Sequence, residues 1–347
     1  MSGVSLVNTP TRKMTKEFIF TEDRQSCHAS TLLEGDTPGE FLVACFEGSC
    51  EGQPDVGIVI SRRSANGGWT ISTRWKINEY PHWNPVLFRL PDSRIACYFK
   101  TGPNPPVWQT WVRYSSDGGQ SWTQPKEVVA GSNTIGCGPS KNKPILLHNG
   151  VILAPASQEN HGWQAFIDRS EDGGATWHRF SPIPMPKVLV DTPRNESDRF
   201  LGVIQPSLWE DNQGDVHALM RSNNHRIYST DSHDGGLTWS EIQPIGIPNN
   251  NSGLDLTRTK SGIIYLLCNP IPENWGLRNR LALFCSHDNG QNWCQETLIE
   301  EAPPSDNDQV ASPEFSYPAI ITTKDGRLAM TYTFNRRNIA FQIRDPQ

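Results

Sequence analysis

Six short hydrophobic segments of this 347-residue chain begin with a side chain that can do chemistry. The six residues are His28, Asn84, Lys143, Gln205, Asp255 and Tyr317. A histidine can act as a base near neutral pH, and a tyrosine can donate a proton. Two arginines elsewhere, Arg221 and Arg278, could hold a ligand carboxylate, because a guanidinium donates paired hydrogen bonds. If the segments meet, these groups could bind an acidic ligand and move a proton.

A repeated turn sequence indicates how the segments are arranged. Asp-Gly-Gly or a variant of it, with Trp close behind, occurs five times, and the tryptophans are Trp69, Trp122, Trp177, Trp239 and Trp293. Consecutive tryptophans are 53, 55, 62 and 54 residues apart. Asp and Gly suit a tight turn, and a buried Trp ring can anchor it. A repeat of this period predicts one supersecondary unit copied about an axis or along a rod.

Each unit has the pattern of four strands. A second apolar segment follows the first after a polar turn, a third leads into the repeated turn, and a fourth leaves it. Six such units predict an all-β, six-bladed propeller that forms a single domain over residues 1–347. The last unit ends with residues 338–344 as its third strand, so we expect residues 16–21 to supply the fourth. Closure by this N-terminal strand would remove the exposed sheet edges.

Composition excludes several classes of partner. The net charge is −6 without a basic run, which argues against nucleic acid as a partner. No apolar stretch approaches membrane-spanning length, and residues 1–16 lack the apolar core of a signal peptide. Eight cysteines without metal-ligand spacing indicate buried thiols in a reducing compartment. We therefore expect a cytoplasmic protein with no membrane partner, no metal and no cofactor.

The innermost strands of a propeller line its axial channel, so the polar starts of the six segments should converge there. Residues at the ends of the second strands, including Glu47, Glu159 and Arg221, should lie close behind. Buried charges are costly unless they are paired, so a polar network that fills the channel is an alternative to a binding site. The long irregular stretch 182–202 is expected to overhang the site.

The repeated turn resembles the Asp-box of sialidases, and residues 17–344 resemble the sialidase-like propellers with BNR repeats. The segment 218–222 is similar to the strand that brings one arginine of the sialidase triad, and 278–281 is similar to the segment that brings another. Residues 46–64 resemble the first-blade segment with the family's acid/base aspartate. The resemblance implies that Arg221 and Arg278 bind a carboxylate and that Asp55 is the acid/base.

The chain departs from the family at three other positions. His28 stands where the family has its first arginine. The place of the nucleophilic tyrosine reads Phe315-Ser316, with Tyr317 close behind, and the place of the glutamate that activates it is occupied by Gln205. The departures therefore fall on the nucleophile pair and on one of the three arginines.

Three functions fit these residues. The first is an exo-glycosidase that releases a terminal acidic sugar, either a sialic or a uronic acid, from an oligosaccharide or glycoconjugate. Its expected catalytic residues are Asp55, His28, Tyr317 and Glu47. Its expected substrate-binding residues are Arg221, Arg278, Lys143, Gln205, Asn84, Asp255, Glu159 and Arg24.

The second function is a lyase that eliminates at a uronic acid. Arginines and Lys143 would neutralise the carboxylate, His28 would remove the neighbouring proton, and Tyr317 would protonate the leaving oxygen. The third function is a glycan-binding propeller without turnover. In that case tryptophans would stack on sugars, although blade packing explains the same rings; they are Trp83, Trp108, Trp163 and Trp275.

Overall fold

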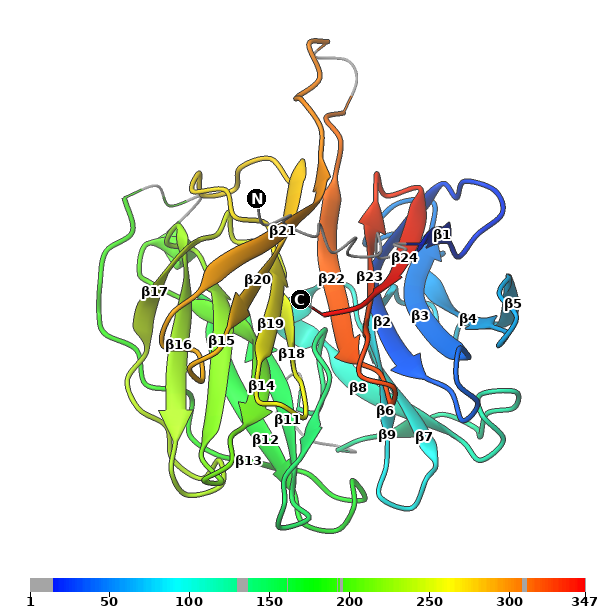
Figure 1. Ribbon diagram of the computed structural model, residues 1–347, viewed down its shortest axis with the longest axis horizontal. Helices are drawn as coiled ribbons and strands as arrows, with labels where there is room; N and C mark the ends of the chain where they lie inside the picture. Colours follow the sequence, from blue (N-terminus) through cyan, green and yellow to red (C-terminus); the bar gives the residue numbers. More distant parts are fainter. Residues whose placement is uncertain are drawn as a thin grey trace, which may run out of the picture.

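The computed structural model describes residues 15–129, 137–160, 162–191, 193, 196–307 and 311–346. Six four-stranded antiparallel sheets surround a central axis and form a six-bladed β-propeller, as the repeats predict (Figure 1). Residues 1–14, which include most of the stretch inspected for a signal peptide, lie outside the described residues. No helix in the described ranges is long and apolar enough to cross a membrane.

The first three blades follow one another along the chain, each built outward from the axis. Blade one contains β2 (Ser26–Glu34), β3 (Phe41–Gly48), β4 (Gly57–Arg63) and β5 (Trp69–Trp75). Blade two contains β6 (His82–Arg89), β7 (Ile95–Thr101), the 3-10 turn η1 (Pro105–Val107), β8 (Gln109–Ser115) and β9 (Lys126–Glu127). Blade three contains β10 (Ile145–Leu146), β11 (Ile152–Gln158), β12 (Gln164–Ser170) and β13 (His178–Arg179).

The last three blades repeat this order. The 3-10 turn η2 (Glu196–Asp198) precedes blade four, which contains β14 (Val203–Glu210), β15 (Val216–Ser222), β16 (Arg226–Ser232) and β17 (Gln243–Pro248). Blade five contains β18 (Asp255–Arg258), β19 (Ile264–Cys268), β20 (Arg280–Ser286) and β21 (Cys294–Glu301). Blade six contains β22 (Phe315–Thr322), β23 (Leu328–Phe334), β24 (Asn338–Arg344) and β1 (Thr15–Phe18).

The N-terminal strand closes the ring, as the sequence predicts. β1 pairs with β24 in antiparallel register from Thr15↔Ile343 to Phe18↔Ala340. Blade six also packs against blade one, where the ring centres of Phe41 and Phe341 lie 5.0 Å apart. Apolar side chains of blades one and six therefore share one buried cluster.

The four complete Asp-box turns (residues 115–122, 170–177, 232–239 and 286–293) share one set of hydrogen bonds. In the second, Ser170 Oγ donates to Asp172 Oδ1 at 2.8 Å and accepts from Gly174 N at 2.8 Å. The same carboxylate accepts from Thr176 N at 2.9 Å and from Thr176 Oγ1 at 2.6 Å. The aspartate therefore holds the turn together, and its role is structural, as the sequence indicates.

The glycine at the fifth position of each Asp-box turn fits against the preceding blade. Gly236 has φ 86°, and a Cβ there would lie 2.7 Å from Leu153 Cδ1 of β11. Gly119 meets Leu42 of β3 in the same way. Only glycine satisfies both the left-handed backbone and the close approach. Each turn thus joins its own blade to its neighbour.

Four innermost strands carry a bulge close to their starts. The bulged residues have left-handed backbones: Ala29 (φ 55°), Asn84 (φ 43°), Gln205 (φ 56°) and Tyr317 (φ 49°). Strand pairing shifts register at each of these places. A bulge leaves one residue unpaired and changes the direction of its side chain. Left-handed non-glycine residues cost roughly 1–2 kcal/mol each, so these four positions are strained.

The Asp-box carboxylates should make the fold sensitive to acid. Hydrogen bonds from Thr176 lower the pKa of Asp172 to about 2, so its stabilisation is complete above pH ~4 and is lost as the pH falls towards 2. We expect Asp172→Asn to lower the free energy of unfolding at pH 7 by about 1 kcal/mol, measured by urea denaturation. Asp306→Asn, at an exposed position, is the control and should change nothing. Equal stability of the two variants would contradict a structural role for Asp172.

Candidate active site

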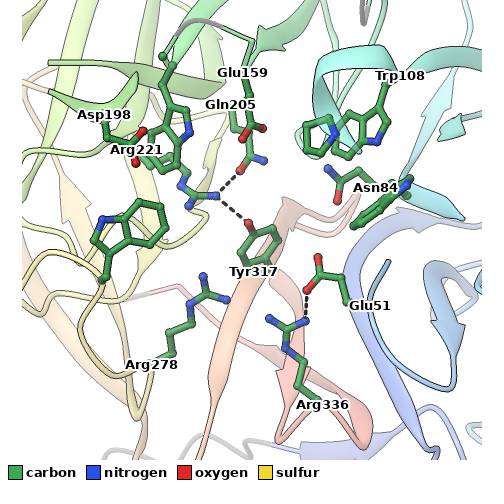
Figure 2. Close-up of a pocket in the computed structure, with 15 residues that line it drawn as sticks. Glu51, Asn84, Trp108, Glu159, Asp198, Gln205, Arg221, Arg278, Tyr317 and Arg336 are labelled. Carbon is green, nitrogen blue, oxygen red and sulfur yellow. Dashed lines mark hydrogen bonds and ion pairs between the residues drawn. The ribbon is translucent and has the colours of Figure 1, made fainter. Parts of the chain in front are cut away.

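A pocket of about 370 Å³ opens where the bulged inner strands begin (Figure 2). Its walls combine amide, aromatic and charged side chains. The main ones are Glu51, Trp83, Asn84, Trp108, Glu159, Trp163, Asp198, Gln205, Arg221, Trp275, Arg278, Tyr317 and Arg336. Three of them, Asn84, Gln205 and Tyr317, are bulged residues that each precede a proline. The structure thus brings six of the twelve expected site residues to one pocket: Asn84, Glu159, Gln205, Arg221, Arg278 and Tyr317.

Arg221 of β15 is the most unusual charge in the pocket. Its side chain reaches between Gln205 and Tyr317, donating from Nη1 to Gln205 Oε1 at 3.2 Å and to Tyr317 Oη at 2.7 Å (Figure 2). The guanidinium lies 4.6 Å from the centre of the Trp163 ring. The residue is only 3% exposed, yet no carboxylate of the described residues forms an ion pair with it. Burying an unpaired charge is costly, so this guanidinium points to an anionic ligand.

Two further guanidinium groups share one carboxylate. Arg278 Nη1 lies 3.2 Å from Glu314 Oε1, and Arg336 Nε lies 2.9 Å from Glu314 Oε2. Burial opposes the charged form of Glu314, but Arg336 and Arg278 outweigh it and hold its pKa below the ordinary value. Arg336 also donates from Nη1 to Glu51 Oε2 at 2.5 Å. The pocket therefore has three arginines, of which the sequence resemblance identified two.

Tyr317 lies at the centre of this cationic group. Its ring is 5.3 Å from the Arg278 guanidinium and 5.5 Å from that of Arg221. On its other side it packs against His28, with ring centres 4.2 Å apart. The phenolic oxygen accepts from Arg221, so negative charge that develops on this oxygen would be stabilised.

His28 lies behind Tyr317 and does not line the pocket. It is 1% exposed, and its Nδ1 is 2.8 Å from Thr333 Oγ1. Burial, reinforced by repulsion from Arg336 and other cations, holds its pKa well below the ordinary value. The imidazole is therefore neutral and supports the Tyr317 ring. The expectation that His28 acts as a base on the ligand is not met by this geometry, because Tyr317 stands between them.

Three acids complete the pocket wall. Burial raises the pKa of Glu159, with repulsion from Asp198 and Glu51 adding to the effect and Arg221 opposing it. A carboxyl group with a raised pKa in a pocket is a candidate proton donor. Figure 2 shows Glu159 and Glu51 on different sides of Tyr317, and Glu51 turned towards Arg336. Sequence reasoning missed Glu51 and gave no role in the site to Asp198 or Arg336.

Asp55, Glu47 and Arg24 lie in a separate pocket of about 450 Å³ beside blade one. Asp55 accepts from the backbone N and the Oγ of Ser49, both at 2.8 Å, and these bonds lower its pKa. Glu47 is held between Arg24 and Arg74. The β3–β4 loop thus directs Glu51 to the arginine pocket and folds Asp55 back on Ser49. This corrects the expectation that Asp55 and Glu47 act beside Arg221.

Lys143 and Asp255 also lie outside the pocket walls. Lys143 Nζ pairs with Asp255 Oδ2 at 2.8 Å, and Asp255 Oδ1 accepts from Ser207 Oγ at 2.7 Å. Beside them Lys141 Nζ donates to two backbone carbonyl groups, and burial lowers its pKa to about 7. These groups form the satisfied polar network that was the alternative to a site. The expectation that Lys143 and Asp255 contact a ligand is therefore not supported.

The irregular stretch before blade four does reach the pocket, through Asp198. The side chain of Asn223 holds this stretch in place. Asn223 Nδ2 donates to the carbonyl oxygens of Asp198 at 3.2 Å and Phe200 at 2.9 Å. Asn223 Oδ1 accepts from Gly202 N at 2.8 Å. Asn274 Nδ2 donates to the carbonyl of the same asparagine at 2.8 Å. The side chain and the backbone carbonyl of one buried residue, two positions after Arg221, thus connect two segments of the pocket wall.

The four tryptophans of the wall are packed in pairs. Trp83 and Trp108 have ring centres 5.4 Å apart, and Trp163 and Trp275 have ring centres 5.6 Å apart. Trp83, Trp108 and Trp163 are almost entirely buried. Packing within these pairs therefore accounts for the burial of three of the four rings.

Comparison with known proteins agrees with the fold. Residues 39–330 match the BNR repeat-like domain family. A sialidase of Paraclostridium sordellii is 25% identical over 151 residues, which is 40% of this chain and 34% of that protein, so the match spans about a third of that relative. The solved Hadza microbial sialidase Hz136 superposes with TM-score 0.71 at 16% identity, over 92% of this chain and 66% of that one. A protein of unknown function from Dyadobacter fermentans gives TM-score 0.71 at 18% identity, over 98% and 100%.

The buried neutral His28 predicts a dependence of stability on pH. Because its pKa is lower in the folded protein, its contribution is complete above pH ~6.5 and falls at lower pH, where the unfolded chain takes up a proton that the folded protein does not. We expect His28→Gln to flatten the pH dependence of the unfolding free energy between pH 6 and 5 by up to about 1.4 kcal/mol per unit. Urea denaturation at several pH values measures it. Parallel curves for wild type and variant would show that His28 is charged in the fold.

Proposed function

Because this chain belongs to the BNR repeat-like domain family, we propose that it is a sialidase-like enzyme that hydrolyses the bond to a terminal acidic sugar. The observation that carries the proposal is the buried guanidinium of Arg221, which has hydrogen-bond partners but no paired carboxylate among the residues the structure describes. A bound sugar acid would supply the missing negative charge. In the channel network, by contrast, Lys143 is paired with the carboxylate of Asp255.

Three arginines hold the ligand carboxylate in this proposal. Arg221 forms no ion pair with a carboxylate in the described part of the chain, whereas Arg278 and Arg336 are both paired with Glu314. Glu51 already bonds Arg336, so the incoming carboxylate competes with Glu51 for that guanidinium. Displacement of Glu51 would free this carboxylate for catalysis at the moment when substrate binds.

The bond cleavage needs an acid, a base and a group that attacks the anomeric carbon. Glu159, whose pKa burial raises, protonates the leaving oxygen. The phenolic oxygen of Tyr317 attacks the anomeric carbon, and Arg221 stabilises the charge on that oxygen. Glu51 takes the phenolic proton, because Gln205 is an amide and cannot. Water, activated by Glu159, then releases the sugar.

Elimination at a uronic acid is the second candidate. The observation in its favour is Gln205, which stands at the tyrosine where sialidases are expected to have a glutamate. A tyrosine without that glutamate could protonate a leaving oxygen. His28 faces Tyr317 and not the pocket, so it cannot serve as the base of the lyase scheme. Tyr317 could still serve as the proton donor.

The direct test is incubation with sialosides and uronic-acid glycans, read by mass spectrometry and ultraviolet absorbance. A released acidic sugar that has gained water supports hydrolysis. An unsaturated product that absorbs in the ultraviolet overturns hydrolysis in favour of elimination. Saturable binding without product supports a glycan-binding propeller.

Binding should depend on Arg221. We expect Arg221→Gln to weaken binding of the free acidic sugar by about 10- to 100-fold, because charge-assisted hydrogen bonds are lost, while the fold is retained. Isothermal titration calorimetry measures the affinity. Arg74→Gln, which removes an exposed guanidinium of the Asp55 pocket, is the matched control. Equal loss in both variants would contradict an anion site at Arg221.

Turnover should depend on the Tyr317 hydroxyl and not on Asp55. Tyr317→Phe keeps the ring on His28 and should lower kcat by at least about 100-fold, with little change in the affinity for the product. Asp55→Asn should leave kcat within about two-fold, because Asp55 lies in the other pocket. A larger effect of Asp55→Asn than of Tyr317→Phe would restore Asp55 as the acid/base and reject the roles given above.

A further inference from the structure

Blade five contains a pair of cysteines on neighbouring strands. Cys285 of β20 and Cys294 of β21 face each other directly in the antiparallel register. Their sulfur atoms are 2.9 Å apart, about 0.9 Å more than a disulfide bond. Directly opposed residues of antiparallel strands have Cα atoms about 4.5–5.5 Å apart, which lies inside the range that a disulfide can bridge. The bond could therefore form with little movement of the backbone.

The two thiols differ in accessibility. Cys285 is buried, whereas Cys294 is exposed at the start of β21, immediately after Trp293 of the Asp-box turn. This corrects the expectation that all eight cysteines are buried, since Cys50 is exposed as well. The imidazole Nε2 of His287 lies 3.8 Å from Cys285 Sγ, near enough to receive its proton. A reagent in solution can thus reach Cys294 Sγ, and the buried Cys285 Sγ lies next to it.

We propose that Cys285 and Cys294 are a site of reversible covalent modification that low-molecular-weight disulfides convert to an intramolecular disulfide. The Cys294 thiolate attacks a sulfur of oxidised glutathione and releases one glutathione. Cys285 then loses its proton and attacks Cys294 Sγ, which releases the second glutathione. One protein disulfide forms from two thiols, and one oxidised glutathione is reduced to two thiols.

The disulfide would join the two outermost strands of blade five, β20 and β21. β21 is the outermost strand of its sheet, and the Asp-box turn 286–293 connects it to β20. A disulfide at the base of this turn closes a short loop and restricts the unfolded chain, which stabilises the fold. Neither Cys285 nor Cys294 lines the arginine pocket, so activity should be unaffected.

The test treats the full-length protein with oxidised glutathione, blocks free thiols with iodoacetamide and analyses tryptic peptides. Residues 281–324 contain no internal Lys or Arg and hold both cysteines in one peptide. The proposal expects this peptide to lose about 2 Da and to carry no alkyl group, and expects dithiothreitol to reverse the change. Two alkyl groups after oxidation, or glutathione that remains on Cys294, would overturn it.

A matched pair of variants links the bond to stability. Oxidation should raise the melting temperature of wild type and of Cys50→Ser by a few degrees, and should not raise that of Cys294→Ser. Cys294 is chosen because replacing an exposed side chain leaves the core intact. If Cys294→Ser and wild type respond equally to the oxidant, the stabilising bond is elsewhere and the proposal fails.

Discussion

The pairing of β1 with β24 is the constraint on which the rest of the structure depends. Every blade packs on two neighbours, so the positions of the inner strands are fixed only when the ring is closed. Closure holds β22 beside β2 and β18, and through them Tyr317 is set against His28 and within 2.7 Å of Arg221. Residues from blades four and six can share a hydrogen bond because a strand from the other end of the chain completes blade six.

The charges around the axis divide into two groups with different environments. Lys143 and Asp255 form an ion pair with each other and fill the channel. Among the residues that the structure describes, Arg221 has neutral hydrogen-bond acceptors and no ion pair. The presence or absence of an ion-pair partner distinguishes a structural polar network from a binding site more clearly than the density of charged residues does. The reason is that the cost of burying a charge depends on whether an opposite charge compensates it.

The fold could be predicted from the sequence because the same four-stranded pattern recurs along the chain. The six repeated pairs of apolar segments indicated the number of blades, and the missing strand of the last unit required the N-terminal segment. The site could be read only in part. Asn84, Gln205 and Tyr317 were found because each begins a hydrophobic segment of the sequence, and a proline follows each of them at the bulge. Glu51 could not be told from Asp55, because the direction of a side chain in an irregular loop depends on a local hydrogen bond to Ser49.

The repeated bulge also bears on how such a pocket can change over evolutionary time. Asn84, Gln205 and Tyr317 occupy the same strained backbone position in three different blades, and each side chain is presented to the pocket by its own strand. A substitution at one of these positions alters the chemistry of the pocket without disturbing the other blades. Relatives with this fold can therefore acquire different reactions by single exchanges at equivalent places, so membership of the family limits the architecture of the pocket more strongly than it limits the bond that is broken.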